Sequence, residues 1–209
     1  MMLLPDKPKH STPEEAKSLI LLFNFLYPLS KATEDYITEN TFPLKLSKGQ
    51  SLHDAGTICA SIYFIQKGAV RGYINDGGKD KTTWISIENE VVSSIYSFVK
   101  QVPSIENMQV IEDCELLQMN QVDVERLYEI SPDFNIAARR VYEKYYADAE
   151  VRALTVRLSN AQKKYEFFLQ TYDHLANRIQ LTYIASFLGM SLETLSRVRA
   201  KFKTAKKNI

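Results

Sequence analysis

The chain has 209 residues, of which 45% are hydrophobic and 24% charged, a composition typical of a folded protein with one large or two small domains. Its longest apolar stretch, residues 18–29, is interrupted by Asn24 and Pro28 and is shorter than the roughly 20 residues that a membrane span requires. The N-terminus also lacks the basic-then-apolar pattern of a signal peptide. We therefore expect a cytoplasmic protein with no contact to a membrane.

Two cysteines, Cys59 and Cys114, and three histidines are too few and too widely spaced for a thiolate or histidine metal site. We expect no metal and no cofactor, and we expect both cysteines to be buried as apolar side chains. Charge is uneven along the chain, because residues 178–209 carry seven Lys or Arg against the single acid Glu193. This basic segment is a candidate surface for a polyanion, and a solvated run of charge is the alternative.

Two short helices are expected first along the chain. Residues 12–15 read Thr-Pro-Glu-Glu, a capping box with proline at the first helical position, and they predict a helix from about residue 13 to 27. Ser30 can cap a second helix that continues to about Asn40.

From Thr41 to about Asn120 the hydrophobic period changes. Runs rich in Val, Ile, Tyr, Phe and Thr alternate with glycine-containing turns, which predicts short antiparallel strands in a barrel or sandwich of about 80 residues. Asp76-Gly77-Gly78 is expected to form a tight hairpin turn. The clearest strands are residues 62–65, 70–74, 83–87 and 115–119.

Ser131-Pro132 begins a helix that is predicted to continue to about Leu158, roughly 40 Å at 1.5 Å per residue. It has two apolar faces, and a small β-domain cannot wrap a helix of this length. We expect its own domains to cover one face and a second copy of the helix to cover the other; burial within a monomer is the alternative. One face carries Phe134, Ala138, Val141, Tyr145 and Ala149, and the opposite face carries Ala147, Val151, Leu154 and Leu158.

A further capping box at residues 159–162, with Ser159 as N-cap, predicts a helix to about Tyr172. The most informative stretch follows at residues 182–202. Gly189 suits a left-handed turn position between two short helices, and Ser191 can cap the second of them. The inward-facing residues are Ile184, Ala185 and Leu188 in the first helix and Leu195, Val198 and Phe202 in the second.

The outer face of the second helix carries Glu193, Arg197 and Ala200. Arginine can bridge guanine O6 and N7, and glutamate can accept from cytosine N4, so this face is expected to contact bases in a DNA major groove. A helical hairpin with a solvated face is the alternative. Phosphate contacts are expected from residues at the two helix starts and from the basic end, namely Thr182, Tyr183, Ser191, Thr194 and Lys201.

Residues 184–197, read as Ile-Ala-x-Phe-Leu-Gly-x-Ser-x-Glu-Thr-Leu-Ser-Arg, resemble the helix-turn-helix of the cyclic-AMP receptor protein and fumarate–nitrate regulator (Crp/Fnr) family. The order of the chain from about residue 30 is similar as well, with Lys48-Gly49 leading into a β-roll that contains residues 63–71. The resemblance implies an α+β fold: an N-terminal double-stranded β-roll of the jelly-roll, cyclic nucleotide-binding type, a long dimerisation helix and a helix-turn-helix domain. The expected bounds are residues 1–130, 131–158 and 159–209.

Three departures from the family pattern limit what can be carried over. Where relatives that bind cyclic AMP have Gly-Glu and Arg-Ser pairs, this chain has Ser93-Ser94 and Ser104-Ile105, with Lys100 as the one nearby cation. We therefore expect a degenerate effector pocket at Ser93, Ser94, Lys100 and Ser104 that does not bind cyclic AMP. Relatives that sense oxygen through an iron–sulfur cluster use several N-terminal cysteines, and no cysteine precedes Cys59 in this chain. Only residues 203–209 follow the second helix, so a short basic tail is expected in place of most of the usual wing.

These observations predict a homodimeric, sequence-specific DNA-binding transcription regulator with an unknown effector, if it has one. Its dimer is expected to join along residues 134–156 and to bind a pseudo-palindromic operator. The resemblance also implies RNA polymerase as a partner. No nucleophile–base pair or metal set suggests an enzyme. The alternative is a small-molecule-binding β-roll module that acts on a protein partner, and the face with Glu193 and Arg197 argues against it.

Overall fold

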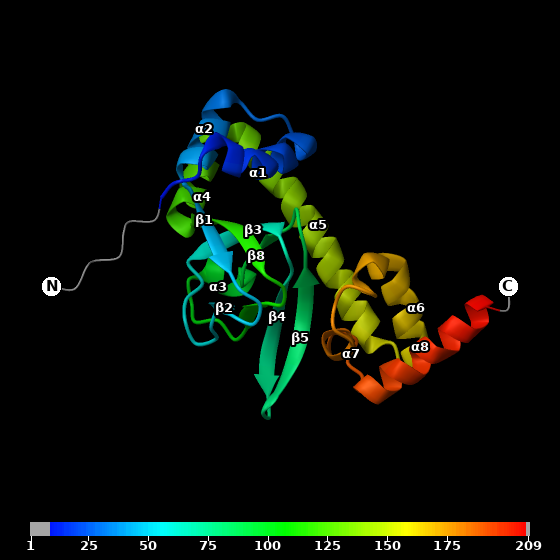
Figure 1. Cartoon of the computed structure of the whole chain (residues 1–209). Helices are drawn as coiled ribbons and strands as arrows, with labels where there is room; N and C mark the ends of the chain where they lie inside the picture. Colours follow the sequence, from blue (N-terminus) through cyan, green and yellow to red (C-terminus); the bar gives the residue numbers. More distant parts are fainter. Residues whose placement is uncertain (1–8, 208–209) are drawn as a thin grey trace. The chain divides into compact units, whose positions relative to one another are not determined.

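The computed structural model describes residues 9–207, and of residues 203–207 it describes the backbone alone (Figure 1). The chain forms two compact units. Unit 1 comprises residues 1–72 and 86–143, and unit 2 comprises residues 73–85 and 144–209. One β-hairpin and the longest helix each begin in unit 1 and continue into unit 2.

Unit 1 begins with two capped helices, α1 (Pro13–Leu26) and α2 (Lys31–Glu39), as predicted. The capping box of α1 is complete: the Thr12 hydroxyl accepts from the Glu15 amide at 3.3 Å, and the Glu15 carboxylate accepts from the Thr12 amide at 2.7 Å. The hydroxyl of Ser30 accepts from the Thr33 amide and caps α2 in the same way.

The β-region forms two four-stranded sheets with the orders β1-β8-β3-β6 and β2-β7-β4-β5. In the first sheet, β8 pairs antiparallel with both β1 and β3. The predicted antiparallel strands are confirmed, and of the two predicted arrangements, barrel or sandwich, the structure shows the sandwich. The four strands that were clearest in the sequence are β3, β4, β5 and β8. The strands are β1 (Thr41–Leu46), β2 (Ser51–His53), β3 (Ser61–Lys67), β4 (Val70–Asp76), β5 (Lys79–Ser86), β6 (Val91–Val92), β7 (Asn107–Val110) and β8 (Cys114–Asn120).

Glycine permits the two turns on either side of β4. The β4–β5 turn holds Gly77 and Gly78 at φ of +61° and +79°, as the sequence predicted for a tight hairpin. Gly68, between β3 and β4, has a φ of +97° and lies against the backbone of residues 113 and 114. A side chain is excluded there both by the backbone conformation and by the close approach of another segment.

Two helices that the sequence pattern did not predict also belong to unit 1. The helix α3 (Ile95–Lys100) has six residues, and α4 (Gln121–Ile130) has ten. Neither has a side-chain hydrogen bond at its N-cap, so the signal that identified α1 and α2 is missing.

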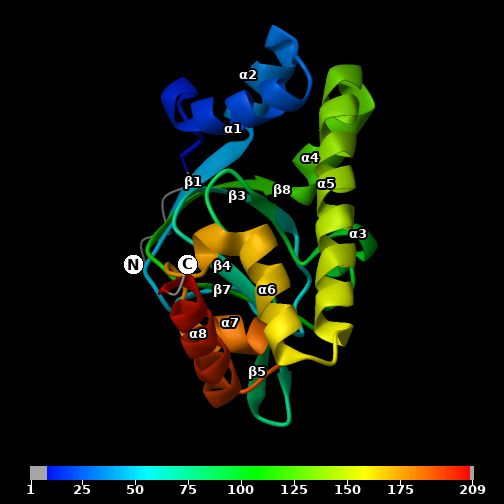
Figure 2. The ribbon, with the colours of Figure 1, turned by 90° about the vertical axis from the view of Figure 1, so that its right-hand side faces the viewer.

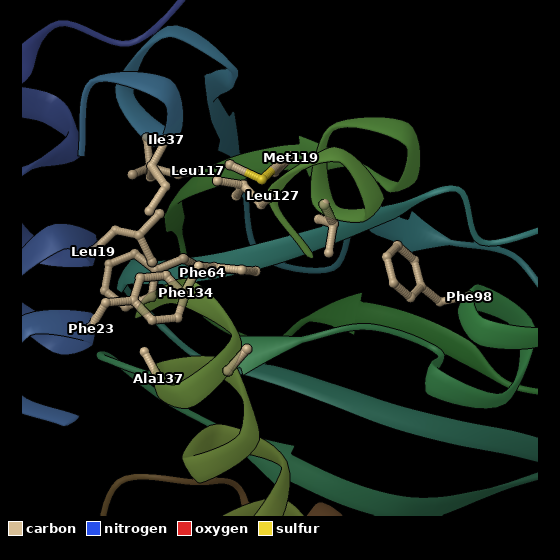
Figure 3. Packing of buried hydrophobic residues seen from close by; sticks show 12 residues of the cluster. Leu19, Phe23, Ile37, Phe64, Phe98, Leu117, Met119, Leu127, Phe134 and Ala137 are labelled. Carbon is tan, nitrogen blue, oxygen red and sulfur yellow. The ribbon is translucent and has the colours of Figure 1, made fainter. Parts of the chain in front are cut away.

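The core of unit 1 lies where the helices pack on the sheet β1-β8-β3-β6 (Figure 3). Phe23 of α1 and Phe134, at the start of the helix α5 (Pro132–Arg157), meet edge to face, with their ring centroids 5.4 Å apart. Phe64 of β3 and Leu127 of α4 are fully buried beside them. This cluster holds the N-terminal helices and the start of the long helix on one sheet.

The long helix α5 (Pro132–Arg157) is covered along its first apolar stripe at its start, whereas Ala149, further along that stripe, is exposed. Phe134 and Ala138 are buried, as expected for the first apolar stripe. In the opposite stripe, Leu154 is 58% exposed and Ala147 is exposed, whereas Val151 is half-buried. Among the described residues, no helix is long and apolar enough to cross a membrane.

Unit 2 contains α6 (Ala161–Tyr172), the short 3-10 helix η1 (Asp173–Leu175), α7 (Leu181–Phe187) and α8 (Leu192–Lys207) (Figure 2). The prediction that Ser159 caps α6 is wrong. The side-chain oxygen of Asn160 accepts from the amides of Gln162 and Lys163 at 2.8 and 3.3 Å, so Asn160 is the N-cap.

An aromatic cluster forms the core of unit 2. Phe168 of α6 is fully buried, with Tyr165 stacked beside it and Phe187 of α7 in edge-to-face contact. Phe202 of α8 packs against Tyr165, with a centroid distance of 5.5 Å. The helices α6, α7 and α8 therefore share one core.

Candidate nucleic-acid interface

The helices α7 and α8 pack through the residues that the sequence predicted to face inward. Ile184, Leu188 and Leu195 are fully buried, and Ala185 is 3% exposed. Gly189 has a φ of +62°, the left-handed conformation that turns the chain between the two helices. The α7–α8 pair is thus a short helix, a tight turn and a longer helix.

The start of α8 is capped as predicted, because the Ser191 hydroxyl accepts from the Thr194 amide at 3.2 Å. Glu193 and Arg197 are both exposed one turn apart. Hydrogen bonds from its own backbone and from Ser191, together with the charge of Arg197, lower the pKa of Glu193, so its carboxylate is ionised at neutral pH. Ala200 is exposed one turn further along. All three predicted base-contact residues therefore lie on the solvent-exposed side of α8.

The predicted phosphate contacts lie at the helix starts. Thr182 is exposed in the first turn of α7, and Ser191 is exposed at the N-cap of α8. Tyr183 and Thr194 are half-buried, and Thr194 accepts from Arg197 at 3.4 Å. Free amides and the positive end of the helix dipole face an anion at such positions.

The basic end of the chain continues α8. Lys201 is exposed, and the helix extends through Lys207, so residues 203–207 are helical and not a separate tail. Their side chains lie outside the described part of the chain.

Two cations in unit 2 have structural roles that the sequence pattern did not reveal. Arg199 donates to the carbonyl of Ala176 at 2.8 Å and lies over the ring of Tyr165. Its guanidinium group therefore bonds within unit 2. Lys164 is 9% exposed, and its amino group donates to the carbonyl of Leu188 at 3.1 Å, at the end of α7. The signal in the sequence for the burial of Lys164 was its position one turn before Phe168, because residues four apart lie on the same face of a helix.

The predicted effector pocket is only partly assembled. Ser94 and Ser104 are buried, with their hydroxyls 2.8 Å apart. Ser93 instead donates to the carbonyl of Ser61 at 3.0 Å and lies 3.3 Å from the thiol of Cys59. Lys100 is exposed at the end of α3.

The protein itself satisfies the hydroxyl groups of this segment. Ser104 donates to the carbonyl of Glu106 and accepts from its amide at 2.7 and 2.9 Å. A ligand phosphate would have to replace these bonds, and neither Gly nor Arg is present in residues 93–105 to bind it. Both cysteines are free and buried, as predicted. The described residues contain no group of three or more His, Cys, Asp or Glu that could hold a metal ion.

Comparison with known proteins agrees with this architecture. Residues 43–131 match the family model of the cyclic nucleotide-binding domain. The chain is 25% identical over 184 residues to the transcriptional activator protein FnrA of Stutzerimonas stutzeri, covering 81% of this chain and 72% of FnrA. These similarities support the resemblance to the Crp/Fnr family that the sequence predicted.

Solved structures share its fold. A structure from Eubacterium rectale assigned to the Crp/Fnr regulators has a TM-score of 0.66 at 16% identity, covering 88% of this chain and 87% of that chain. The c-di-GMP-responsive global regulator CLP of Xanthomonas campestris has a TM-score of 0.67 at 14% identity, covering 85% and 93%.

Proposed function

We propose that the chain is a sequence-specific DNA-binding transcription regulator and that the α7–α8 pair is its helix-turn-helix. The observation that carries the proposal is the outer face of α8. Glu193 and Arg197 are exposed there, while Leu195 and Val198 on the opposite side are buried. An exposed arginine and an ionised glutamate one turn apart can read base edges in the major groove. The relative FnrA is named as a transcriptional activator, which supports the same function.

The residues divide into two roles in this proposal. Glu193, Arg197 and Ala200 specify sequence, whereas Thr182, Tyr183, Ser191, Thr194 and Lys201 bind phosphates and set affinity. Leu192 stands where family members often carry a further arginine, so one guanine contact is replaced by an apolar contact with a thymine methyl. We expect the preferred half-site to differ from the usual one at that position.

The regulator acts as a homodimer in this proposal. The exposed residues of the second apolar stripe of α5, Ala147 and Leu154, support pairing with the same helix of a second copy along residues 134–156. A two-fold dimer would place two copies of α8 about 34 Å apart, one turn of DNA, on a pseudo-palindromic site. Light scattering at micromolar protein should give the dimer mass, and a monomer mass independent of concentration would contradict the proposal.

DNA binding is tested by fluorescence anisotropy with duplexes from the organism's own promoters. Arg197→Ala should weaken binding to the cognate duplex by about 1–3 kcal/mol and leave binding to random duplex nearly unchanged. Lys201→Ala should weaken binding to both and lower the slope of log affinity against log salt by about one unit. Arg126→Ala, an exposed arginine on α4, is the matched control and should change neither. An equal loss on cognate and random duplex for Arg197→Ala would refute base readout by this face.

The effector of this regulator is not cyclic AMP in our proposal. The serine hydroxyls of the pocket are bonded within the protein, and a bound phosphate would lack the charge-assisted bonds that are worth roughly 1.5–3 kcal/mol each. CLP, which is named as responsive to c-di-GMP, supports the idea that this fold accommodates different ligands. Calorimetry with cyclic AMP should show no binding at micromolar concentration. RNA polymerase at the promoter is the expected protein partner of the DNA-bound dimer.

A further inference from the structure

The β4–β5 hairpin packs against α7 within unit 2. Figures 1 and 2 both show β5 beside α7. The hydroxyl of Ser186 makes the contact: it accepts from the amide of Thr82 at 2.9 Å and donates to the carbonyl of Asp80 at 3.1 Å. Both bonds join a side chain of α7 to the backbone of β5.

This contact provides hydrogen bonds to the backbone of an edge strand. β5 is the last strand of its sheet, and the Ser186 hydroxyl supplies an acceptor for the amide of Thr82 and a donor for the carbonyl of Asp80. The single hydroxyl of Ser186 satisfies both groups, and Thr82 is only 5% exposed. An unpaired backbone group at such a buried position is costly, which favours the docked hairpin.

The docked hairpin forms one wall of an open groove of about 960 Å³. Lys79 and Lys81 line it from the hairpin, and Thr182 and Ser191 line it from the starts of α7 and α8. Lys81 is paired with Asp76, whereas Lys79 is exposed. Thr182 and Ser191 are also exposed, so the docked hairpin leaves the predicted phosphate contacts accessible.

We propose that the β4–β5 hairpin is a third element of the DNA-binding surface, in which Ser186 holds the hairpin on α7 and Lys79 contacts a backbone phosphate. That phosphate lies next to those bound by Thr182 and Ser191. The inference rests on the proposed function and adds a contact from outside the helix-turn-helix. Ser186 is a positioning residue, because it touches the hairpin and not the DNA.

The contact between Ser186 and the hairpin is tested first without DNA, by amide hydrogen exchange. Ser186→Ala removes the acceptor of the Thr82 amide and should increase its exchange rate roughly twofold to tenfold, in line with the loss of one hydrogen bond. Ser186→Thr retains the hydroxyl and should restore protection. The amide of Gly68, which donates to the Glu88 carboxylate in unit 1, is the internal control and should not change. An unchanged exchange rate of the Thr82 amide in Ser186→Ala would show that Ser186 does not hold the hairpin and would overturn the inference.

The DNA contact is tested by the salt dependence of binding to random duplex. Lys79→Gln should lower the slope of log affinity against log salt by about one unit, and Lys48→Gln, an exposed lysine of unit 1, should leave it unchanged. Ser186→Ala should lower the slope by a similar amount, and the variant with both changes should lose no more than either alone.

The other outcomes are equally decisive. Tighter DNA binding by Ser186→Ala would mean that the hairpin obstructs DNA and would overturn the inference. An unchanged slope for Lys79→Gln in a chain that binds DNA would overturn this inference and leave the proposed function standing. A wild-type chain that binds no duplex would overturn both.

Discussion

The turn at Gly68 should be among the least tolerant positions of unit 1. Its φ of +97° is unfavourable for any residue with a Cβ, at a cost of about 1–2 kcal/mol. A Cβ would also lie 2.5 Å from the carbonyl oxygen of Asp113 and 2.6 Å from the sulfur of Cys114. Cys114 is buried at the start of β8, which is paired on both sides, so it cannot move away freely, and overpacking of this kind costs about 1–3 kcal/mol. We therefore expect Gly68→Ala to lower the free energy of unfolding by about 2–5 kcal/mol.

Gly49 provides a matched control for the backbone contribution. Its φ is +91°, and no atom lies within 4 Å of the position that a Cβ would take. Gly49→Ala should therefore cost only the backbone penalty of about 1–2 kcal/mol. Urea unfolding followed by circular dichroism gives both values, provided that the slope of the transition is unchanged. Equal losses for the two variants would show that the contact with residues 113 and 114 relaxes, and the reasoning from close approach would fail.

Three further predictions concern packing, pH and thiol reactivity. Phe168→Ala should destabilise unit 2 by about 3–5 kcal/mol in thermal unfolding, because the ring is fully buried, and a loss below about 1 kcal/mol would contradict that. Burial would raise the pKa of Asp133, but hydrogen bonds from the start of α2 and from the Phe134 amide outweigh it and lower the pKa. The stability that this carboxylate contributes is present above its unfolded pKa of about 3.9 and is lost as the pH falls through the folded value, so melting temperatures measured below about pH 4 should fall more steeply in the wild type than in Asp133→Asn. Burial raises the pKa of the Cys114 thiol to about 11, so iodoacetamide at pH 8 should modify it only after unfolding; rapid modification of the native chain would refute this.

Elements with local signals could be predicted from the sequence. The capping box at Thr12, the glycine pair at residues 77–78 and the left-handed Gly189 each depend on neighbours within a few residues. The inward faces of α7 and α8 follow from helical spacing alone. The two faces of α5 were visible for the same reason.

Features that depend on contacts between distant segments could not be predicted. The burial of Lys164 requires the end of α7, 24 residues later, and the role of Ser186 requires a hairpin more than 100 residues earlier. At residues 159–160 two possible capping residues are adjacent, and only the hydrogen bonds that the Asn160 side chain accepts assign the cap to it. The serines near α3 were predicted as one pocket, but Ser93 bonds to the Ser61 carbonyl instead of joining Ser94 and Ser104.

The position of the chain's one tryptophan gives the hairpin an intrinsic optical probe. Trp84 lies on β5, two residues after Thr82, and lines the groove beside α7. Its indole is half-buried, so its emission wavelength and quenching by iodide depend on whether the hairpin is docked. Since no other tryptophan contributes, a spectral change at temperatures below the unfolding transition can be assigned to this segment. Unlabelled DNA can then be titrated into the native protein, and the response of the hairpin can be followed without introducing a dye.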